Sequence, residues 1–140
     1  MQHKPRITLD FPKNRIRLLY SSLRLLHFPD YVRLLVNPMQ GIIALQISDS
    51  HDMRAQRLIG RYEKTKDRID LHSKELMGKI KLFGEWDMSK AYRFEGVFHP
   101  EEGMIVYPIT APQDVQSGTT ADSIKSMEHM PNEWKYSNRS

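Results

Sequence analysis

Two stretches of the chain resemble each other: "NRIRLLYSSLRLL" runs from Asn14 to Leu26, and "DRIDLHSKELMGKI" runs from Asp67 to Ile80. Both open with Asn or Asp followed by Arg-Ile, and both place Leu two residues after the Ile and again five residues beyond that. In each, a β-type segment comes first, and apolar residues then follow at helical spacing. The sequence therefore predicts a strand and then a short helix at two places in the chain.

A hairpin is predicted after each of these stretches. "DYVRLLV" (30–36) and "GIIALQIS" (41–48) flank the turn "NPMQG", and "KAYRFEGVF" (90–98) and "MIVYPIT" (104–110) flank "HPEEG". Turn residues between two β-rich runs are typical of a hairpin. Four residues of the first hairpin recur in the same order in the second. They are Pro38, Gly41, Ile43 and Ile47, matching Pro100, Gly103, Ile105 and Ile109.

Helix caps and strand ends can also be predicted. Ser21 or Ser22 is an N-cap candidate for the first helix, which Pro29 would end, and Ser73 is the candidate for the second. The segment "LIGRYEKTKDRIDL" (58–71) reads as a strand, a charged turn and a strand. Pro108 should lie at a strand end or on an edge, because it has no N–H to donate to a ladder.

The expected fold is α+β, with two pseudo-repeated β-α-β-β units at about 14–48 and 67–110. Neither unit could bury its apolar face alone, so we expect the two to form one β-rich barrel or saddle-like sheet. On this interpretation residues 1–110 are a single domain. Residues 111–140 are polar, and we expect a flexible C-terminal tail there. Trp134 and Tyr136 lie in that tail, where they would either dock a partner or fold back onto the domain.

The stretch from Asn14 to Ser48 resembles the half-unit of the AbrB/MraZ-type swapped-hairpin DNA-binding proteins. The shared features are a strand with an Arg-Ile pair, a short helix rich in Leu and Arg, and an Ile-rich hairpin. The MraZ-like branch carries two such units in tandem. The chain departs from the family at Asn14 and Asp67, where the family has Gly, and in lacking a Pro after the first strand. The resemblance implies DNA binding by a small regulator. A saddle of the TATA-binding type is an equally compatible architecture.

Composition narrows the class of protein. There is no cysteine, so disulfides and thiolate chemistry are excluded, which suits a reducing, cytoplasmic location. No apolar run approaches the ~20 residues that a membrane-spanning helix requires. The formal net charge is +4, and residues 1–40 hold seven Lys or Arg against two acids. Residues 61–81 hold seven against four, whereas residues 82–110 hold two against five. The basic excess lies in the two similar stretches, which favours an anionic partner.

The cations follow the strand period. Arg15 and Arg17 are two residues apart and should share one sheet face, and Lys64, Lys66 and Arg68 have the same spacing. A line of cations suits contact with the phosphates of double-stranded DNA, although alternation alone also leaves a polar face in water. Tyr20, Tyr31, Tyr62 and Tyr92 would stack on bases or pack in the core. The residues predicted to contact DNA are Arg15, Arg17, Arg24, Arg33, Lys64, Lys66, Arg68 and Lys74.

No catalytic site, metal site or cofactor is predicted. The six histidines lack metal-ligand spacing, and Glu101 and Glu102 fall in a turn. An enzyme would require a cleft gathering groups such as His72, Glu75 or Asp87, which no motif suggests. The alternative to a transcriptional or mobile-element regulator is a non-enzymatic protein-interaction module that uses the hairpins and the tail. Exposed strand edges allow either pairing of the halves within one chain or a homodimer.

Overall fold

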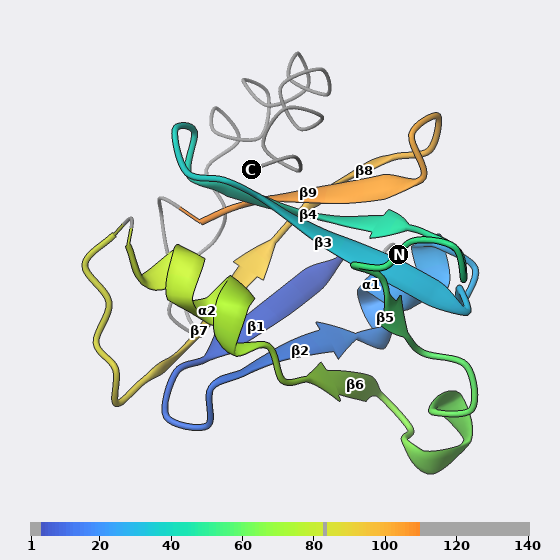
Figure 1. The fold of residues 1–140 in the computed structure, drawn as a ribbon, viewed down its shortest axis with the longest axis horizontal. Coiled ribbons are helices and arrows are strands. Elements are labelled where there is room, and N and C mark those ends of the chain that lie inside the picture. Colours follow the sequence, from blue (N-terminus) through green and yellow to red (C-terminus); the bar gives the residue numbers. More distant parts are fainter. Residues whose placement is uncertain (1–3, 83, 110–140) are drawn as a thin grey trace.

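The computed structural model describes residues 4–82 and 84–109. Within them the chain forms two antiparallel sheets with few helical residues, so the β-rich α+β class is confirmed. Figure 1 shows the two sheets as stacked layers, with α2 and α1 near opposite ends. The expected tail at 111–140 lies outside the described residues.

Sheet A has four strands in the order β6-β2-β1-β7. They are β1 (Arg6–Asp10), β2 (Arg15–Leu19), β6 (Arg68–Leu71) and β7 (Ala91–Glu95). The prediction is confirmed for β2 and β6, which pair with each other. Strand β1 was not predicted, yet it pairs on one side with β2 and on the other with β7. Buried and half-buried residues alternate along β2 and β6, as expected for a sheet with one core face and one solvated face.

Sheet B has five strands in the order β5-β3-β4-β9-β8. They are β3 (Tyr31–Asn37), β4 (Ile42–Ile47), β5 (Gln56–Arg57), β8 (Val97–His99) and β9 (Met104–Pro108). Both predicted hairpins are present, because β3 pairs with β4 and β8 pairs with β9. Pro108 is the last residue of β9, where its missing N–H costs least.

One predicted strand is divided between the sheets. Lys90–Phe98 was expected to be continuous, but it forms β7 in sheet A and β8 in sheet B, separated by Gly96. A Cβ on Gly96 would lie 2.7 Å from side-chain atoms of both Ile105 and Tyr107. Only a residue without a side chain therefore lets the chain pass so close to β9 at this point.

The prediction of a strand beginning at Leu58 is wrong. Gly60 has a φ of 82°, which interrupts an extended backbone, and residues Tyr62–Lys64 form the 3-10 helix η1. The N–H groups of Leu58 and Ile59 both donate to the carbonyl of Asp30. These two hydrogen bonds hold the chain beside Asp30 before it enters sheet A as β6.

The two helices differ in how they begin. Helix α2 (Lys74–Lys81) starts as predicted, with the Ser73 side chain accepting the N–H of Leu76. Helix α1 (Tyr20–Leu25) starts one residue before the predicted caps, and Leu19 at its N-cap makes no side-chain hydrogen bond. Ser22 is instead buried: its hydroxyl donates to the carbonyl of Arg6 and accepts from the hydroxyl of Tyr107. The predicted cap is thus a core contact between α1 and β9.

The main core lies between the sheets. Ile16 and Leu18 of sheet A and Ile43 and Leu45 of sheet B belong to one buried cluster, together with Leu23 of α1. Met77 and Ile80 add the apolar face of α2. Both helices therefore pack on the inner side of the two layers.

Candidate nucleic-acid interface

The outer face of sheet A carries a grid of charged side chains. Arg15 and Arg17 alternate with the fully buried Ile16 and Leu18, so the prediction that the two arginines share one face is confirmed. Cross-strand partners lie on the same face, which places Thr8 beside Arg17. The register also places Asp70 beside Arg17.

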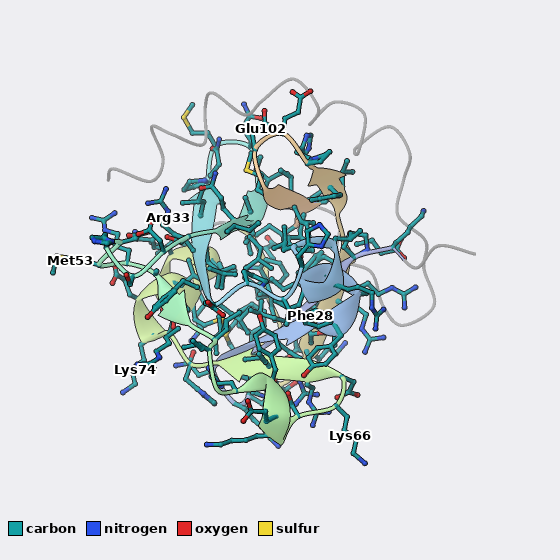
Figure 2. The ribbon with its side chains drawn as sticks, turned by 90° about the vertical axis from the view of Figure 1, so that its right-hand side faces the viewer. Phe28, Arg33, Met53, Lys66, Lys74 and Glu102 are labelled. Atoms are coloured by element: carbon teal, nitrogen blue, oxygen red, sulfur yellow. The ribbon has the colours of Figure 1, made fainter. Side chains whose placement is uncertain are left out.

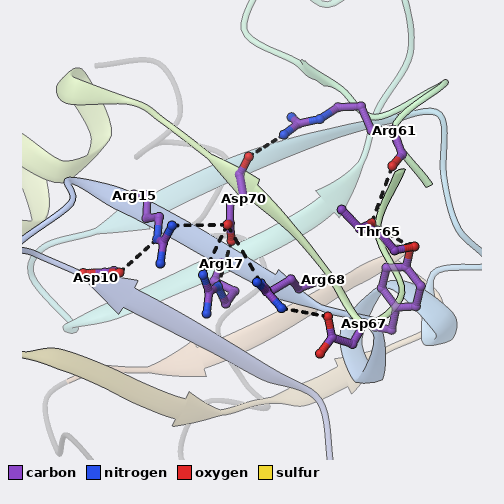
Figure 3. A network of polar contacts seen from close by, with 9 residues as sticks. Asp10, Arg15, Arg17, Arg61, Thr65, Asp67, Arg68 and Asp70 are labelled. Carbon is purple, nitrogen blue, oxygen red and sulfur yellow. Dashed lines mark hydrogen bonds and ion pairs between the residues drawn. The ribbon is translucent and has the colours of Figure 1, made fainter. Parts of the chain in front are cut away.

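Asp70 is the centre of this grid (Figure 3). One of its carboxylate oxygens accepts from Arg17 Nε at 2.8 Å and the other from Arg17 Nη2 at 3.3 Å. Arg15 Nη1 lies 3.5 Å from Asp70 Oδ2, and Arg68 Nε lies 4.0 Å from it. Arg15 is also held by Asp10, with 2.9 Å between Nε and Oδ2. One carboxylate thus orients three guanidinium groups, which each retain further N–H donors.

The protonation states follow from these contacts. Burial alone would raise the pKa of Asp70, but the Arg17 hydrogen bonds and the charges of Arg17, Arg15 and Arg68 outweigh it and lower that pKa. The hydrogen bond to Asp70 raises the pKa of Arg17 above its ordinary value. Asp70 and Arg17 are therefore both charged at neutral pH.

Hydrogen bonds hold the loop that precedes β6 against the edge of sheet A. Arg61 donates to the backbone carbonyl of Asp70, and Thr65 Oγ1 lies 3.0 Å from the Tyr20 hydroxyl. Tyr20 and Tyr62 form a T-shaped and tilted ring cluster with Phe28, and Tyr62 donates to the carbonyl of Pro29. The packing interpretation therefore holds for these two tyrosines. It also holds for Tyr92, whose ring packs against those of Phe11 and Trp86.

Two arginines on this face were not predicted. Arg93 lies opposite Thr8, which in turn lies opposite Arg17, so a row runs from Asp70 across all four strands to Arg93. Arg6 lies on the same face and donates through Nη2 to Glu95 at 3.2 Å. Sequence reasoning missed both because β1, which joins β2 to β7, was not predicted. Alternation around Ile7 and Leu9 is the signal that was available.

The remaining predicted residues do not join this grid. Arg33 is on sheet B, where its Nη1 lies 3.1 Å from Asp52. Arg24 is exposed on α1, Lys64 is in η1, Lys66 follows η1, and Lys74 begins α2. Figure 2 shows Arg33, Lys66 and Lys74 at separate places on the molecular surface. Of the eight predicted residues, the structure brings together Arg15, Arg17 and Arg68.

The charge balance of the grid is positive. Its side chains include five arginines and three carboxylates, which leaves a formal charge of +2 on the outer face of sheet A. These residues are Arg6, Arg15, Arg17, Arg68 and Arg93, with Asp10, Asp70 and Glu95. At its borders Lys4 adds a cation 4.0 Å from Glu95 and Asp67 adds a carboxylate 3.0 Å from Arg68, so the balance stays at +2.

A cleft of about 300 Å³ lies elsewhere, between β3, α2 and the loop before β5. Leu34, Val36 and Leu76 line its apolar side, and Arg54 and Glu75 line its polar side. Glu75 is exposed and lies 3.8 Å from Lys79. Neither His72 nor Asp87 is among the described residues that line it, and no group of three metal-ligating residues occurs within 4–82 and 84–109.

Comparison with protein-family models, with curated proteins and with solved structures finds no match to this chain. Among the described residues, no helix is long and apolar enough to cross a bilayer. The geometry of the outer face of sheet A is thus the main observation that bears on function.

Proposed function

We propose that this protein is a small, cytoplasmic DNA-binding regulator of transcription or of a mobile element, and that it contacts double-stranded DNA with the outer face of sheet A. The carrying observation is the grid of five arginines on this face, three of which lie within 4.0 Å of Asp70. A guanidinium held by one carboxylate keeps donors for a phosphate, and its side chain is already ordered before binding. Strands presented to a DNA groove are an established way of reading DNA.

The ion pairs of sheet A hold its arginines in the positions that the proposed DNA contact requires. Arg15, Arg17 and Asp70 are half-buried, so their geometry is set by the sheet rather than by solvent. Arg93 and Arg6 are more exposed and lie at the far side of the grid, where a phosphate can approach. The net charge of +2 on the face favours approach of a polyanion.

Fluorescence anisotropy with a labelled duplex tests this function. Wild-type protein should bind at low salt, and log K should fall with log salt by about 0.9 for each phosphate contacted. Arg93→Glu should weaken binding by about tenfold or more through lost and repelled phosphate contacts. The matched control is Arg57→Glu, which reverses an exposed arginine on β5 of sheet B. Absence of binding at low salt, or equal losses in both variants, would refute the proposal.

We further propose that the two halves are copies of one β-α-β-β unit related by an internal two-fold axis. The sequence match equates Ile16 with Ile69 and Leu18 with Leu71, and the observed register is Ile16↔Leu71 and Leu18↔Ile69. Such crossed pairing is what a two-fold axis between β2 and β6 requires. The axis would pass between Arg17 and Asp70.

Sheet B shows the same crossed pairing about a local two-fold axis of its own. The hairpin match equates Ile43 with Ile105, and therefore Leu45 with Tyr107. The observed register pairs Ile43 with Tyr107 and Leu45 with Ile105, so the axis would pass between Ala44 and Val106. Expression of residues 1–56 and 57–140 separately tests the duplication as a folding unit. A cooperative thermal transition in either piece alone would contradict the need for intramolecular pairing, whereas order only on mixing would support it.

A second function, a protein-interaction module, is favoured by the edge of β3. The carbonyls of Tyr31 and Asn37 accept bonds on the β4 side, so the backbone groups of Leu34 and Val36 point to the other side. On that side of β3, strand β5 pairs only with Tyr31 and Val32, and the cleft lies beside the rest of the strand. An extended peptide could add as a strand at this edge, with a side chain in the cleft.

A peptide array tests this second function against the first. Leu34→Pro removes an N–H that points away from the sheet, together with a side chain that lines the cleft and packs on the core, so strand addition should fail. Leu34→Ala shortens the same side chain but keeps the N–H, and it is the matched control. Capture of extended apolar peptides by wild type and by Arg93→Glu, but not by Leu34→Pro, would favour the interaction module. Capture that is unchanged in Leu34→Pro would exclude the β3 edge.

A further inference from the structure

The centre of the outer face of sheet B is apolar, unlike that of sheet A, and the polar pair Arg33 and Gln46 lies at one end of it. Ile43 and Leu45 of β4 point into the main core, so Ile42 and Ala44 point to the opposite side. Residues of β3 and β9 complete a second buried cluster there. Its members are Leu35, Ile42, Ala44, Met104 and Val106.

These five side chains are between 0 and 4% exposed, although they point away from the core. Helices α1 and α2 put their buried side chains into the main core, and no described strand stacks on this face. The loop before β5 borders this face at Arg33, through Asp52, and at Leu35, which lines the cleft together with Met53 and Arg54. It leaves Ile42, Ala44, Met104 and Val106 without a cover among the described residues. Ala91, on the outer face of sheet A, is exposed, whereas Ala44 is 0% exposed. A cover on this face is therefore required, and the described residues do not supply it.

The chain itself leaves sheet B at the border of this face. Pro108 pairs with Ile42, and the N–H of Ile109 donates to the carbonyl of Gly41. Residues 110–140 follow directly, and an extended chain covers ~3.3 Å per residue against ~4.8 Å between neighbouring strands, so they can span the five strands several times. This segment contains Ile124, Met127, Met130 and Trp134, which are apolar side chains with no place in the two described layers.

We propose that residues 110–140 of the same chain cover the outer face of sheet B and place apolar side chains against Ile42, Ala44, Met104 and Val106. Strands β4 and β9 are then buried on both faces, which their nearly continuous apolar sequences require. The proposal also assigns Trp134 and its neighbours to the chain's own sheet rather than to a partner protein. It does not depend on DNA binding.

Methionine oxidation in the full chain tests this cover. Met39 and Met53 are 96% and 99% exposed and report free solvent access, whereas Met77 is 0% exposed and reports the intact core. Under limited peroxide, Met104 should oxidise about tenfold or more slowly than Met39 and Met53, because oxidation follows exposure. The rate for Met104 should not change with protein concentration, since the cover belongs to the same chain.

Two variants decide what provides the protection. Ala44→Arg places a charge under the cover and should make Met104 react as fast as Met39, while Ala91→Arg, the same change on sheet A, should leave it slow. If Ala44→Arg also exposes Met77, it has unfolded, and the combined substitution of Ile124→Ser, Met127→Gln, Met130→Gln and Trp134→Ser decides instead. This second variant lies outside both sheets and should expose Met104 alone.

Three results would overturn the proposal. Met104 could react as fast as Met39 in wild type, which would mean that the face is open. Its protection could increase with protein concentration, which would assign the cover to a second copy. It could also stay protected in the four-residue variant while Met77 is slow, which would exclude the apolar residues of this segment as the cover.

Discussion

The outer faces of sheet A and sheet B differ in the kind of side chain they carry and in how exposed those side chains are. On sheet A most outward residues are polar, and the arginines and carboxylates satisfy one another across neighbouring strands. On sheet B the central outward positions carry Leu35, Ile42, Ala44, Met104 and Val106, all nearly inaccessible. Sheet A can therefore face solvent or a polyanion directly, whereas sheet B needs an apolar cover.

The difference between the sheets is visible in their strand sequences. Strand β2 reads "RIRLL", with charge and bulk alternating, but β9 reads "MIVYP", with no polar position to face water. Alternation indicates a sheet with one wet face, and an unbroken apolar run indicates burial on both faces. Because Gly96 is where one stretch of chain passes from sheet A to sheet B, it is the position at which the two-sheet arrangement is most sensitive to substitution.

Gly96→Ala should therefore destabilise the protein more than the charge reversals on the outer face of sheet A. The new Cβ would meet Ile105 Cγ2 and Tyr107 Cδ2 at 2.7 Å, inside a core where both neighbours are fully buried. Overpacking of this kind costs about 2–3 kcal/mol, and at this position it also pushes the chain between β7 and β8 away from β9. Urea unfolding followed by circular dichroism measures the loss as a lower midpoint.

Gly78→Ala is the matched control for that substitution. Gly78 is within α2, and a Cβ there would meet nothing within 4 Å. The alanine should stabilise the protein by about 0.5–1 kcal/mol through helix propensity. Equal destabilisation by both substitutions would show that the tight contact at Gly96 is not what limits the fold.

Much of the architecture follows from local sequence. The Ser73 cap, the turns at 37–41 and 99–103, and the hairpins they close were all predicted, because each depends on residues next to one another. What could not be predicted depends on distant neighbours. Ser22 was assigned to a helix cap because its contact with Tyr107, 85 residues away, cannot be read from its own surroundings.

In the candidate site too, local sequence predicted some features, whereas others depend on residues that are distant in the sequence. Alternation placed Arg15 and Arg17 on one face, but Arg33, which was also predicted to contact DNA, lies in β3 of the other sheet. The role of Asp70 was missed because one Asp within "DRIDL" gives no indication that three arginines converge on it. Its cross-strand position opposite Arg17 is fixed by strand pairing over 53 residues of sequence.

Charge reversal at the proposed two-fold axis should have an intermediate effect. If β2 and β6 are equivalent strands, pairing of like strands would place Arg17 against Arg17 or Asp70 against Asp70, whereas pairing of the two halves joins Arg17 with Asp70. Arg17→Asp and Asp70→Arg should each destabilise the protein by about 2 kcal/mol, because each leaves like charges together at a half-buried position.

The double variant with both reversals restores an opposite pair. It should regain about 1 kcal/mol relative to the sum of the single changes, measured as a coupling energy in a double-mutant cycle. Light scattering on the single variants adds a second measurement, since loss of the Arg17–Asp70 pair should increase association between chains. Strict additivity with unchanged monomers would remove this ion pair as the element that selects intramolecular pairing.

The pH dependence of stability should show the smallest effect, and it should come from sheet A. The pKa of Asp70 in the folded protein lies below 3.8, its ordinary value, because Arg17, Arg15 and Arg68 favour the carboxylate. The stabilising contribution of Asp70 is therefore complete above its unfolded pKa and is lost as the pH falls through its folded pKa.

Between pH 6 and pH 3, wild type should lose stability relative to Asp70→Asn by less than about 1 kcal/mol, because solvent partly screens the group. Asp87→Asn is the control, since that carboxylate has a lowered pKa but is exposed and bonds only within its own loop. A pH profile for Asp70→Asn that runs parallel to wild type would mean that the arginines hold one another in place without Asp70, and the outer face of sheet A would then be ordered by its strands alone.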